Sequence, residues 1–115
     1  MVKCSSDELD AVFGALADPT RRDILRRGST TQMSIGEIAK PYGMSLAAIS
    51  KHIRVLEKAK FVTKTRVGKQ YFVSISPFAF EEASSYLKEY EKLWNDRLDR
   101  LEKFLSFLPG NRGQK

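Results

Sequence analysis

The chain has 115 residues, 42% of them hydrophobic and 30% charged, which is enough for one domain with a buried core. We find no apolar run near the ~18 residues of a membrane span and no signal-peptide pattern, so we expect no membrane partner. The single cysteine, Cys4, leaves no internal disulfide and suits a reducing cytoplasm, where we expect the protein to act.

The net charge of +6 is concentrated in one short stretch of the sequence. Residues 51–70 contain a single acid, Glu57, and seven basic residues: Lys51, Arg54, Lys58, Lys60, Lys64, Arg66 and Lys69. Acidic and basic residues balance over the rest of the chain. A solvated charged face normally mixes both signs, so this segment predicts a surface for a polyanion.

The N-terminal part predicts two helices with recognisable start and stop signals. The first is expected over residues 7–17. The second helix is predicted to begin after Asp18, which caps it, with Pro19 as its first residue, and Gly28 is placed to end it.

A helix-turn-helix follows. Ser34 is placed to cap a third helix over 35–42, which Pro41 in its last turn keeps short. Gly43 supplies a turn, and Ser45 caps the next helix. Two helices joined by a short turn containing glycine are typical of a helix-turn-helix.

The helix after Ser45 has two different faces. One face repeats apolar residues at helical spacing and is predicted to face a core: Leu46, Ile49, Ile53 and Leu56. On the other face, Ala47 and Ala48 would let the helix backbone approach the major groove of B-DNA, and thymine methyl groups would accept them. The side chains expected to reach base edges or phosphates are Ser45, Ser50, Lys51 and Arg54.

Residues 61–76 alternate as strands do, and Gly68 divides them into a hairpin. A basic hairpin directly after a helix-turn-helix is the order of a winged helix. Lys64, Arg66 and Lys69 surround its tip and are predicted to contact the neighbouring DNA backbone or the minor groove.

The last element is predicted to be one helix over 77–108, followed by a disordered tail over 109–115. About 32 residues make a helix of roughly 48 Å, longer than a 115-residue globule of roughly 35 Å. Its apolar residues recur at helical spacing, so we expect it to lie against a second copy of the chain. The predicted interface includes residues of the first helix and of the last: Leu9, Val12, Phe13, Leu16, Leu87, Tyr90, Trp94, Leu98, Leu101, Phe104 and Leu105.

The predicted fold is mainly α with a small β-hairpin: a dimeric winged helix-turn-helix with five helices and a two-stranded wing. We expect a single domain over 1–115, in which residues 5–75 form the DNA-binding core and wing and 77–108 form the dimerisation helix. The predicted partner is double-stranded DNA, an inverted-repeat operator bound by the homodimer.

Two segments carry a resemblance to a known family. "ALADPTRRDIL" (15–25), together with "MSLAAISKHIRVLEKAKFV" (44–62) and the wing at Gly68, resembles the ArsR family of transcriptional repressors. The resemblance covers residues 8–108 and implies a dimeric winged-helix protein that represses promoters until a signal, a small molecule or a protein, releases it. It also implies that Thr20, Arg21 and Arg22 lie near the DNA backbone.

The sequence departs from the metal-sensing members of that family. Their Cys-x-Cys motif is replaced here by Ser34, Ile35 and Gly36, and the last helix has no histidine. Zinc, arsenite and similar soft ions need thiolate or imidazole ligands. One cysteine and one histidine cannot supply three or four of them, so we expect no metal site, no cofactor and no response to metal.

Other interpretations of single residues remain. His52, on the helix after Ser45 that is predicted to enter the major groove (the recognition helix), is either a DNA contact or a half-buried, hydrogen-bonded histidine. Asp96 and Asp99 alternate with arginines, as on a solvated helix face. No nucleophile lies in a recognisable context, so we expect no enzyme. The alternative function is a winged helix that binds a protein or RNA without operator specificity.

Overall fold

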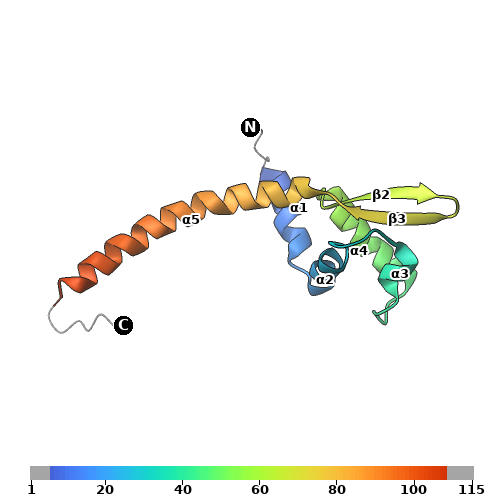
Figure 1. Ribbon diagram of the computed structural model, residues 1–115, viewed down its shortest axis with the longest axis horizontal. Helices are drawn as coiled ribbons and strands as arrows, with labels where there is room; N and C mark the ends of the chain where they lie inside the picture. The colour runs from blue at the N-terminus through green and yellow to red at the C-terminus, as the bar shows by residue number, and fades with distance from the viewer. Residues whose placement is uncertain (1–5, 109–115) are drawn as a thin grey trace. The chain divides into compact units, whose positions relative to one another are not determined.

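The computed structural model describes residues 6–108, and the chain divides into two compact units, residues 1–83 and 84–115. The described part of the first unit contains four helices, three strands and the beginning of α5 (Pro77–Ser106) (Figure 1). The described part of the second unit is the continuation of that helix. The mainly helical, winged helix-turn-helix fold predicted from the sequence is therefore confirmed. The tail expected over 109–115 lies outside the described residues.

Local capping chemistry determines the first two helices. α1 (Ser6–Leu16) and α2 (Pro19–Arg27) are separated by Asp18, whose carboxylate accepts a hydrogen bond from the backbone N–H of Arg21 at 3.0 Å. That hydrogen bond holds the pKa of Asp18 below its usual value, because it favours the charged carboxylate. Gly28 caps the end of α2 as predicted.

α3 (Ile35–Ala39) ends three residues earlier than predicted. Its start is the expected one: the side chain of Ser34 accepts from the N–H of Glu37, and the Glu37 carboxylate accepts from the N–H of Ser34. Pro41 has no N–H to donate to the carbonyl of Glu37 four residues before it. Arg27 from α2 donates to that carbonyl instead, at 3.1 Å, so the helix end is satisfied from outside.

α4 (Leu46–Lys58) is the second helix of the helix-turn-helix. Ser45 caps it by accepting a hydrogen bond from the backbone N–H of Ala48 at 3.1 Å. After the helix the chain turns at Lys60, the only described residue other than glycine with a positive φ, 68°.

The sheet has three strands, where the sequence predicted only two. β2 (Val62–Val67) and β3 (Gln70–Ile75) form the expected antiparallel hairpin, and Gly68 in its turn has a φ of 64°. β1 (Met33–Ser34), where the sequence predicted no strand, pairs with the other edge of β3, so the order is β1-β3-β2. Two residues are too few for an alternation signal, and only the distant backbone of β3 makes them a strand.

The core of the first unit lies between the helices and the base of the hairpin. Its largest fully buried side chains come from α2, α3, α4 and the first residues after α4: Ile24, Ile38, Ile49, Ile53, Leu56, Phe61 and Val62. Phe61 also makes an edge-to-face contact with Phe80, with ring centroids 4.8 Å apart. The beginning of α5 completes the core with Ala79 and Ala83.

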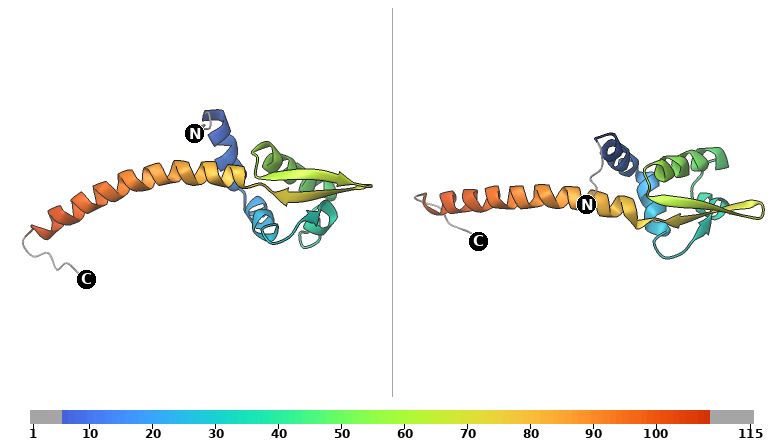
Figure 2. Two further views of the ribbon diagram at one scale, coloured as in Figure 1. Left: turned by 45° about the horizontal axis from the view of Figure 1, so that its top comes forward. Right: turned by 90° about the horizontal axis from the view of Figure 1, so that it is seen from above.

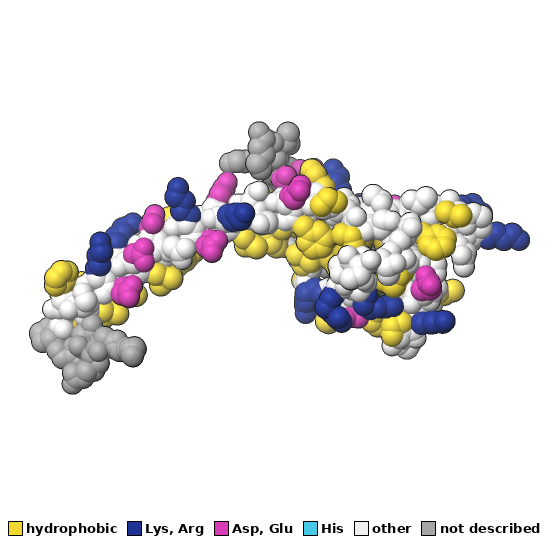
Figure 3. Space-filling view, viewed as in Figure 1, with side chains coloured by type: hydrophobic (Ala, Val, Ile, Leu, Met, Phe, Trp, Pro, Cys, Tyr) yellow, Lys and Arg dark blue, Asp and Glu magenta, His cyan; other side chains and the backbone are white. Residues whose placement is uncertain are grey.

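The described part of the second unit has no buried residue of its own, since every large apolar side chain from 87 to 108 is exposed. In Figure 3 these side chains follow one side of α5 and charged groups of both signs follow the other. None of the described helices has a stretch long and apolar enough to cross a membrane.

Candidate nucleic-acid interface

α4 has one buried and one exposed face. Ile49 and Ile53 have no exposed surface, whereas Ala47, Lys51 and Arg54 are exposed. Within residues 6–108 neither Lys51 nor Arg54 forms an ion pair, so both charges are available to a partner. The structure thus has the two faces that the apolar spacing of this helix predicted, with these basic groups outside the core.

The first turn of α4 corrects one expectation. Leu46, predicted to face the core, is instead 59% exposed and lines a hollow together with Ile35 and Ser50. Its neighbour Ala47 is exposed and Ala48 is half-buried. The leading end of the helix is therefore apolar, with a large side chain at Leu46 and small ones at Ala47 and Ala48, and Ser45 is occupied in capping it.

The wing carries three of the predicted basic residues, and two of them are held by contacts. The Nζ of Lys64 lies 5.1 Å from the ring centroid of Tyr71, and the guanidinium of Arg66 lies 5.7 Å from it. Lys64 is also 3.8 Å from a carboxylate oxygen of Glu57, which offsets part of its charge. Lys69 lies in the turn beside Gly68 and makes no ion pair with the described residues. Figure 2 shows the hairpin extending beyond the helices of this unit.

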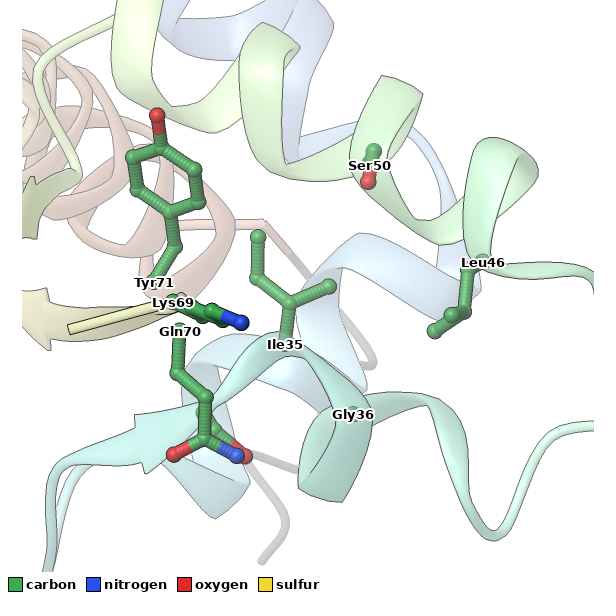
Figure 4. Close-up of a pocket in the computed structure, with 8 residues that line it drawn as sticks. Ile35, Gly36, Leu46, Ser50, Lys69, Gln70 and Tyr71 are labelled. Atoms are coloured by element: carbon green, nitrogen blue, oxygen red, sulfur yellow. The ribbon is translucent and has the colours of Figure 1, made fainter. Parts of the chain in front are cut away.

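A hollow of about 250 Å³ lies between the start of α4, α3 and the hairpin (Figure 4). Leu46 and Ser50 line it from α4, Ile35 from α3, and Lys69 and Tyr71 from the hairpin. The recognition helix and the wing thus border one concave surface with a basic side chain at its edge.

The arginines at the start of α2 have a structural use. Arg22 donates a hydrogen bond to the carbonyl of Leu16 at 2.7 Å, and Arg21 donates to the carbonyls of Gly14 and Ala15 at 3.1 and 2.8 Å. Both therefore satisfy the C-terminal carbonyls of α1, where a cation also complements the helix dipole. Thr20, the other residue placed near DNA by the family resemblance, is half-buried.

His52 is half-buried and hydrogen-bonded, as one of the two interpretations of the sequence expected, and a DNA contact of its ring stays a prediction. Its side chain is only 21% exposed, and its Nδ1 accepts a hydrogen bond from Arg21 at 3.2 Å. Nothing in the sequence pointed to this pair, because the two residues are thirty-one positions apart.

The residues at the family's metal-motif positions are engaged in other ways. Ser34 caps α3 and is buried, and Gly36 has no side chain. Among residues 6–108 no three His, Cys, Asp or Glu side chains form a group that could hold a metal ion. Cys4 lies outside the described residues.

The predicted interface residues fall into two groups. Those of α5 are 43–59% exposed: Leu87, Tyr90, Trp94, Leu98, Leu101, Phe104 and Leu105. On α1, Leu9, Phe13 and Leu16 are half-buried. Val12 is 4% exposed in the core of a single chain, so its side chain is not free to contact a second copy.

A helix-turn-helix with an exposed basic helix, followed by a basic hairpin, defines a winged helix-turn-helix DNA-binding protein. Comparison with known proteins supports this assignment to the helix-turn-helix class. A family model described as a helix-turn-helix domain matches residues 16–65. The transcriptional repressor SdpR of Bacillus subtilis is 28% identical over 71% of this chain and 91% of its own length.

Two further comparisons identify the family. The uncharacterised helix-turn-helix regulator YuzN of Bacillus subtilis is 46% identical over 52% of this chain and 73% of its own length. The crystal structure of an ArsR family transcriptional regulator superposes with a TM-score of 0.77, at 33% identity over 82% of this chain and 97% of the other. The chain belongs to the ArsR family of helix-turn-helix transcriptional regulators and is not an enzyme.

Proposed function

We propose that this protein is a sequence-specific repressor that binds double-stranded operator DNA as a homodimer, through α4 and the wing. The observation that carries the proposal is the exposed face of α4, where Lys51 and Arg54 follow the small Ala47, next to a hairpin that carries Lys69. Repression, as opposed to activation, is supported by the similarity to SdpR, which is a transcriptional repressor.

The proposed contacts divide by role. We assign phosphate contacts to the basic side chains of the wing, Lys64, Arg66 and Lys69, and such contacts position a protein without reading the sequence. Ser50 and Lys51 lie on the helix that would enter the major groove, where base edges are distinguishable. We therefore assign sequence preference to α4 and general affinity to the wing.

The proposed dimer rests on the exposed stripe of α5. Leu87, Trp94 and Leu101 recur every seven residues and are 54%, 55% and 51% exposed. A single helix in water gains little stability from its own contacts, so thirty helical residues with this stripe need a covering surface. A second copy offers the same stripe, and a two-fold axis would pair two recognition helices with an inverted repeat, about one turn of DNA apart.

We also propose that the signal that releases the operator is not a soft metal ion. The chain has one cysteine and one histidine, and the ring nitrogen Nδ1 of that histidine accepts a hydrogen bond from Arg21. Soft ions such as arsenite need thiolates, and zinc sites take three or four ligands from Cys, His, Asp and Glu. No three such side chains in the described part of the chain, residues 6–108, form a group that could hold a metal ion. Titration calorimetry is expected to show no stoichiometric, micromolar binding of zinc, nickel, cadmium or arsenite; one tight metal per subunit would contradict this.

DNA binding is tested by footprinting the DNA upstream of the protein's own gene against random duplex. Affinity is expected to fall by orders of magnitude between roughly 50 and 200 mM salt, because phosphate contacts release counterions. Lys69→Ala should weaken all sequences alike, whereas Lys51→Ala should also reduce the preference for the operator. Lys92→Ala, an exposed lysine of α5, serves as the control and should change neither. Binding of RNA or of a protein in place of duplex DNA would support the alternative module.

The dimer is tested by charge substitutions on two sides of α5. Leu101→Glu removes an apolar side chain that is half exposed, so its burial is worth about 1 kcal/mol, or about 2 kcal/mol over the two copies. That loss alone weakens association about thirtyfold, before the desolvation of the new charge. Lys103→Glu, two residues further and on a different face, should leave association intact. A folded Leu101→Glu monomer that still protects both half-sites at full affinity would show that α5 has another purpose.

A further inference from the structure

Arg21 joins three helices of the first unit. Its backbone N–H donates to Asp18, which begins α2. The guanidinium donates through Nε to the carbonyl of Ala15 at 2.8 Å and through one terminal nitrogen to Gly14 at 3.1 Å, in the last turn of α1. The other terminal nitrogen donates to Nδ1 of His52, in the middle of α4, at 3.2 Å.

The chemistry of this contact has only one form. An arginine side chain is always protonated and only donates, so Nδ1 of His52 must be the acceptor. In the neutral ring the proton then lies on Nε2. The carboxylate of Asp18 is 3.9 Å from Nδ1, too far for a hydrogen bond, and is already occupied by the N–H of Arg21.

The planar guanidinium fixes two directions at once. The apolar contacts of Ile49 and Ile53 hold α4 in the core, but they are not directional. The hydrogen bonds that the planar guanidinium of Arg21 makes to α1 carbonyls and to His52 are directional. Because Lys51 is the residue before His52, a rotation of α4 that breaks this bond also moves Lys51 in the groove.

We infer that Arg21 is a positioning residue for the recognition helix: by linking the last turn of α1 to His52, it sets the orientation of α4, and it does not itself bind a DNA phosphate. This inference rests on the proposed operator binding. It gives Arg21 a role different from the one that the family resemblance implies, because three of its five side-chain N–H groups are used inside the protein.

The chain offers a matched control. Arg22 also donates to an α1 carbonyl, that of Leu16, but it forms no hydrogen bond to the described residues of α4. We expect Arg21→Ala to lower operator affinity about fivefold or more, the equivalent of one lost hydrogen bond, and to leave random-duplex affinity and the salt slope unchanged. We expect Arg22→Ala to leave the preference for operator over random duplex intact. A salt slope reduced by about one, with equal loss on both DNAs, would make Arg21 a phosphate contact and overturn the inference.

Substitutions of His52 separate positioning from DNA contact. The amide of asparagine lies close to where Nδ1 stood, and that of glutamine close to Nε2. If His52 acts through Arg21, His52→Asn should keep operator affinity, and His52→Gln and His52→Leu should lose it. If His52→Gln keeps affinity and His52→Asn loses it, the ring acts through Nε2 and the inference is wrong.

Two further measurements test the inference even if a variant folds poorly or if the proposed function is wrong. Arg21→Lys keeps the charge, but a single ammonium group cannot bridge the α1 carbonyls and His52, so it should behave like Arg21→Ala. A double-mutant cycle in urea unfolding, with Arg21→Ala and His52→Leu, should be non-additive by about fivefold in the unfolding equilibrium constant. Additive losses would show that no such contact exists.

The two failures are distinguishable. A wild-type protein with no operator preference refutes the proposed function, and the positioning role with it, although the cycle would still report the contact. A wild-type preference that Arg21→Ala and Arg22→Ala change to the same extent refutes the positioning role alone.

Discussion

The turn after α4 allows a stability prediction in which backbone and side chain have opposite effects. Lys60 has a φ of 68°, and the N–H groups of Lys60 and Phe61 donate to the carbonyls of Glu57 and Leu56 at 3.0 and 2.9 Å. This is the Schellman arrangement, whose left-handed position is usually glycine. A residue with a Cβ is strained there by about 1–2 kcal/mol.

The lysine side chain offsets part of this strain. Its Nζ lies 5.3 Å from the ring centroid of Phe78 and 3.9 Å from a carboxylate oxygen of Glu8. Both partners of the ion pair are at least half exposed, so that pair contributes about 0–1 kcal/mol, and the ring contact about 0.5–1 kcal/mol. Comparing Lys60→Gly with wild type would mix these contributions.

A comparison of Lys60→Gly with Lys60→Ala isolates the backbone, because both variants lack the lysine contacts. Relief of about 1–2 kcal/mol of strain is reduced by the extra freedom of unfolded glycine, about 0.5–1 kcal/mol. We expect Lys60→Gly to be more stable than Lys60→Ala by about 1 kcal/mol. The measurement is urea unfolding followed by circular dichroism at a fixed protein concentration, with equal slopes for the two variants.

The control reverses the sign. Arg54 lies inside α4 and is exposed, so Arg54→Ala should be more stable than Arg54→Gly by about 1 kcal/mol. If Lys60→Ala is as stable as Lys60→Gly while the Arg54 pair differs as expected, residue 60 is not in the left-handed conformation and the reasoning is refuted.

Three further predictions concern the first unit. The hydrogen bond from Arg21 lowers the pKa of Asp18, so its contribution is present above the usual value of 3.8 and is lost as the pH falls through the lower, folded value; Asp18→Asn should flatten the acid side of a pH–stability curve, and an unchanged curve would contradict this. Phe61→Ala should destabilise the protein by about 3–5 kcal/mol in urea unfolding, because Phe61 has no exposed surface; a cost below 1 kcal/mol would show that the core closes around the change. Tyr42 donates a hydrogen bond to Asp23 at 2.5 Å and thereby lowers the pKa of that carboxyl. Tyr42→Phe should therefore raise the pKa of Asp23 in an NMR titration, and an unchanged pKa would show that this hydrogen bond is not the cause.

Much of the candidate interface was predictable from the sequence because its signals are periodic or local. The 3.6-residue period of α4 placed Ile49, Ile53 and Leu56 in the core and left Lys51 and Arg54 exposed. The hairpin followed from strand alternation around Gly68. Which of these exposed groups contact DNA stays a prediction.

The sequence by itself determined where α2, α3 and α4 begin, because a capping side chain reaches only backbone groups within three or four residues. Asp18 accepting from Arg21, and Ser45 accepting from Ala48, are contacts of this kind.

The tertiary structure alone decided the features that depend on groups far apart in the chain. Pro41 removes the donor at the end of α3, but only the packing of α2 brings Arg27 to the carbonyl left free, and β1 exists because its backbone meets β3. Leu46 is exposed and Val12 is buried because the packing of the other elements covers one position and not the other. Helical periodicity does not specify that packing. Arg21 reaches His52, thirty-one residues away, because the packing of α1, α2 and α4 brings them together, and a hydrogen bond forms only at that distance.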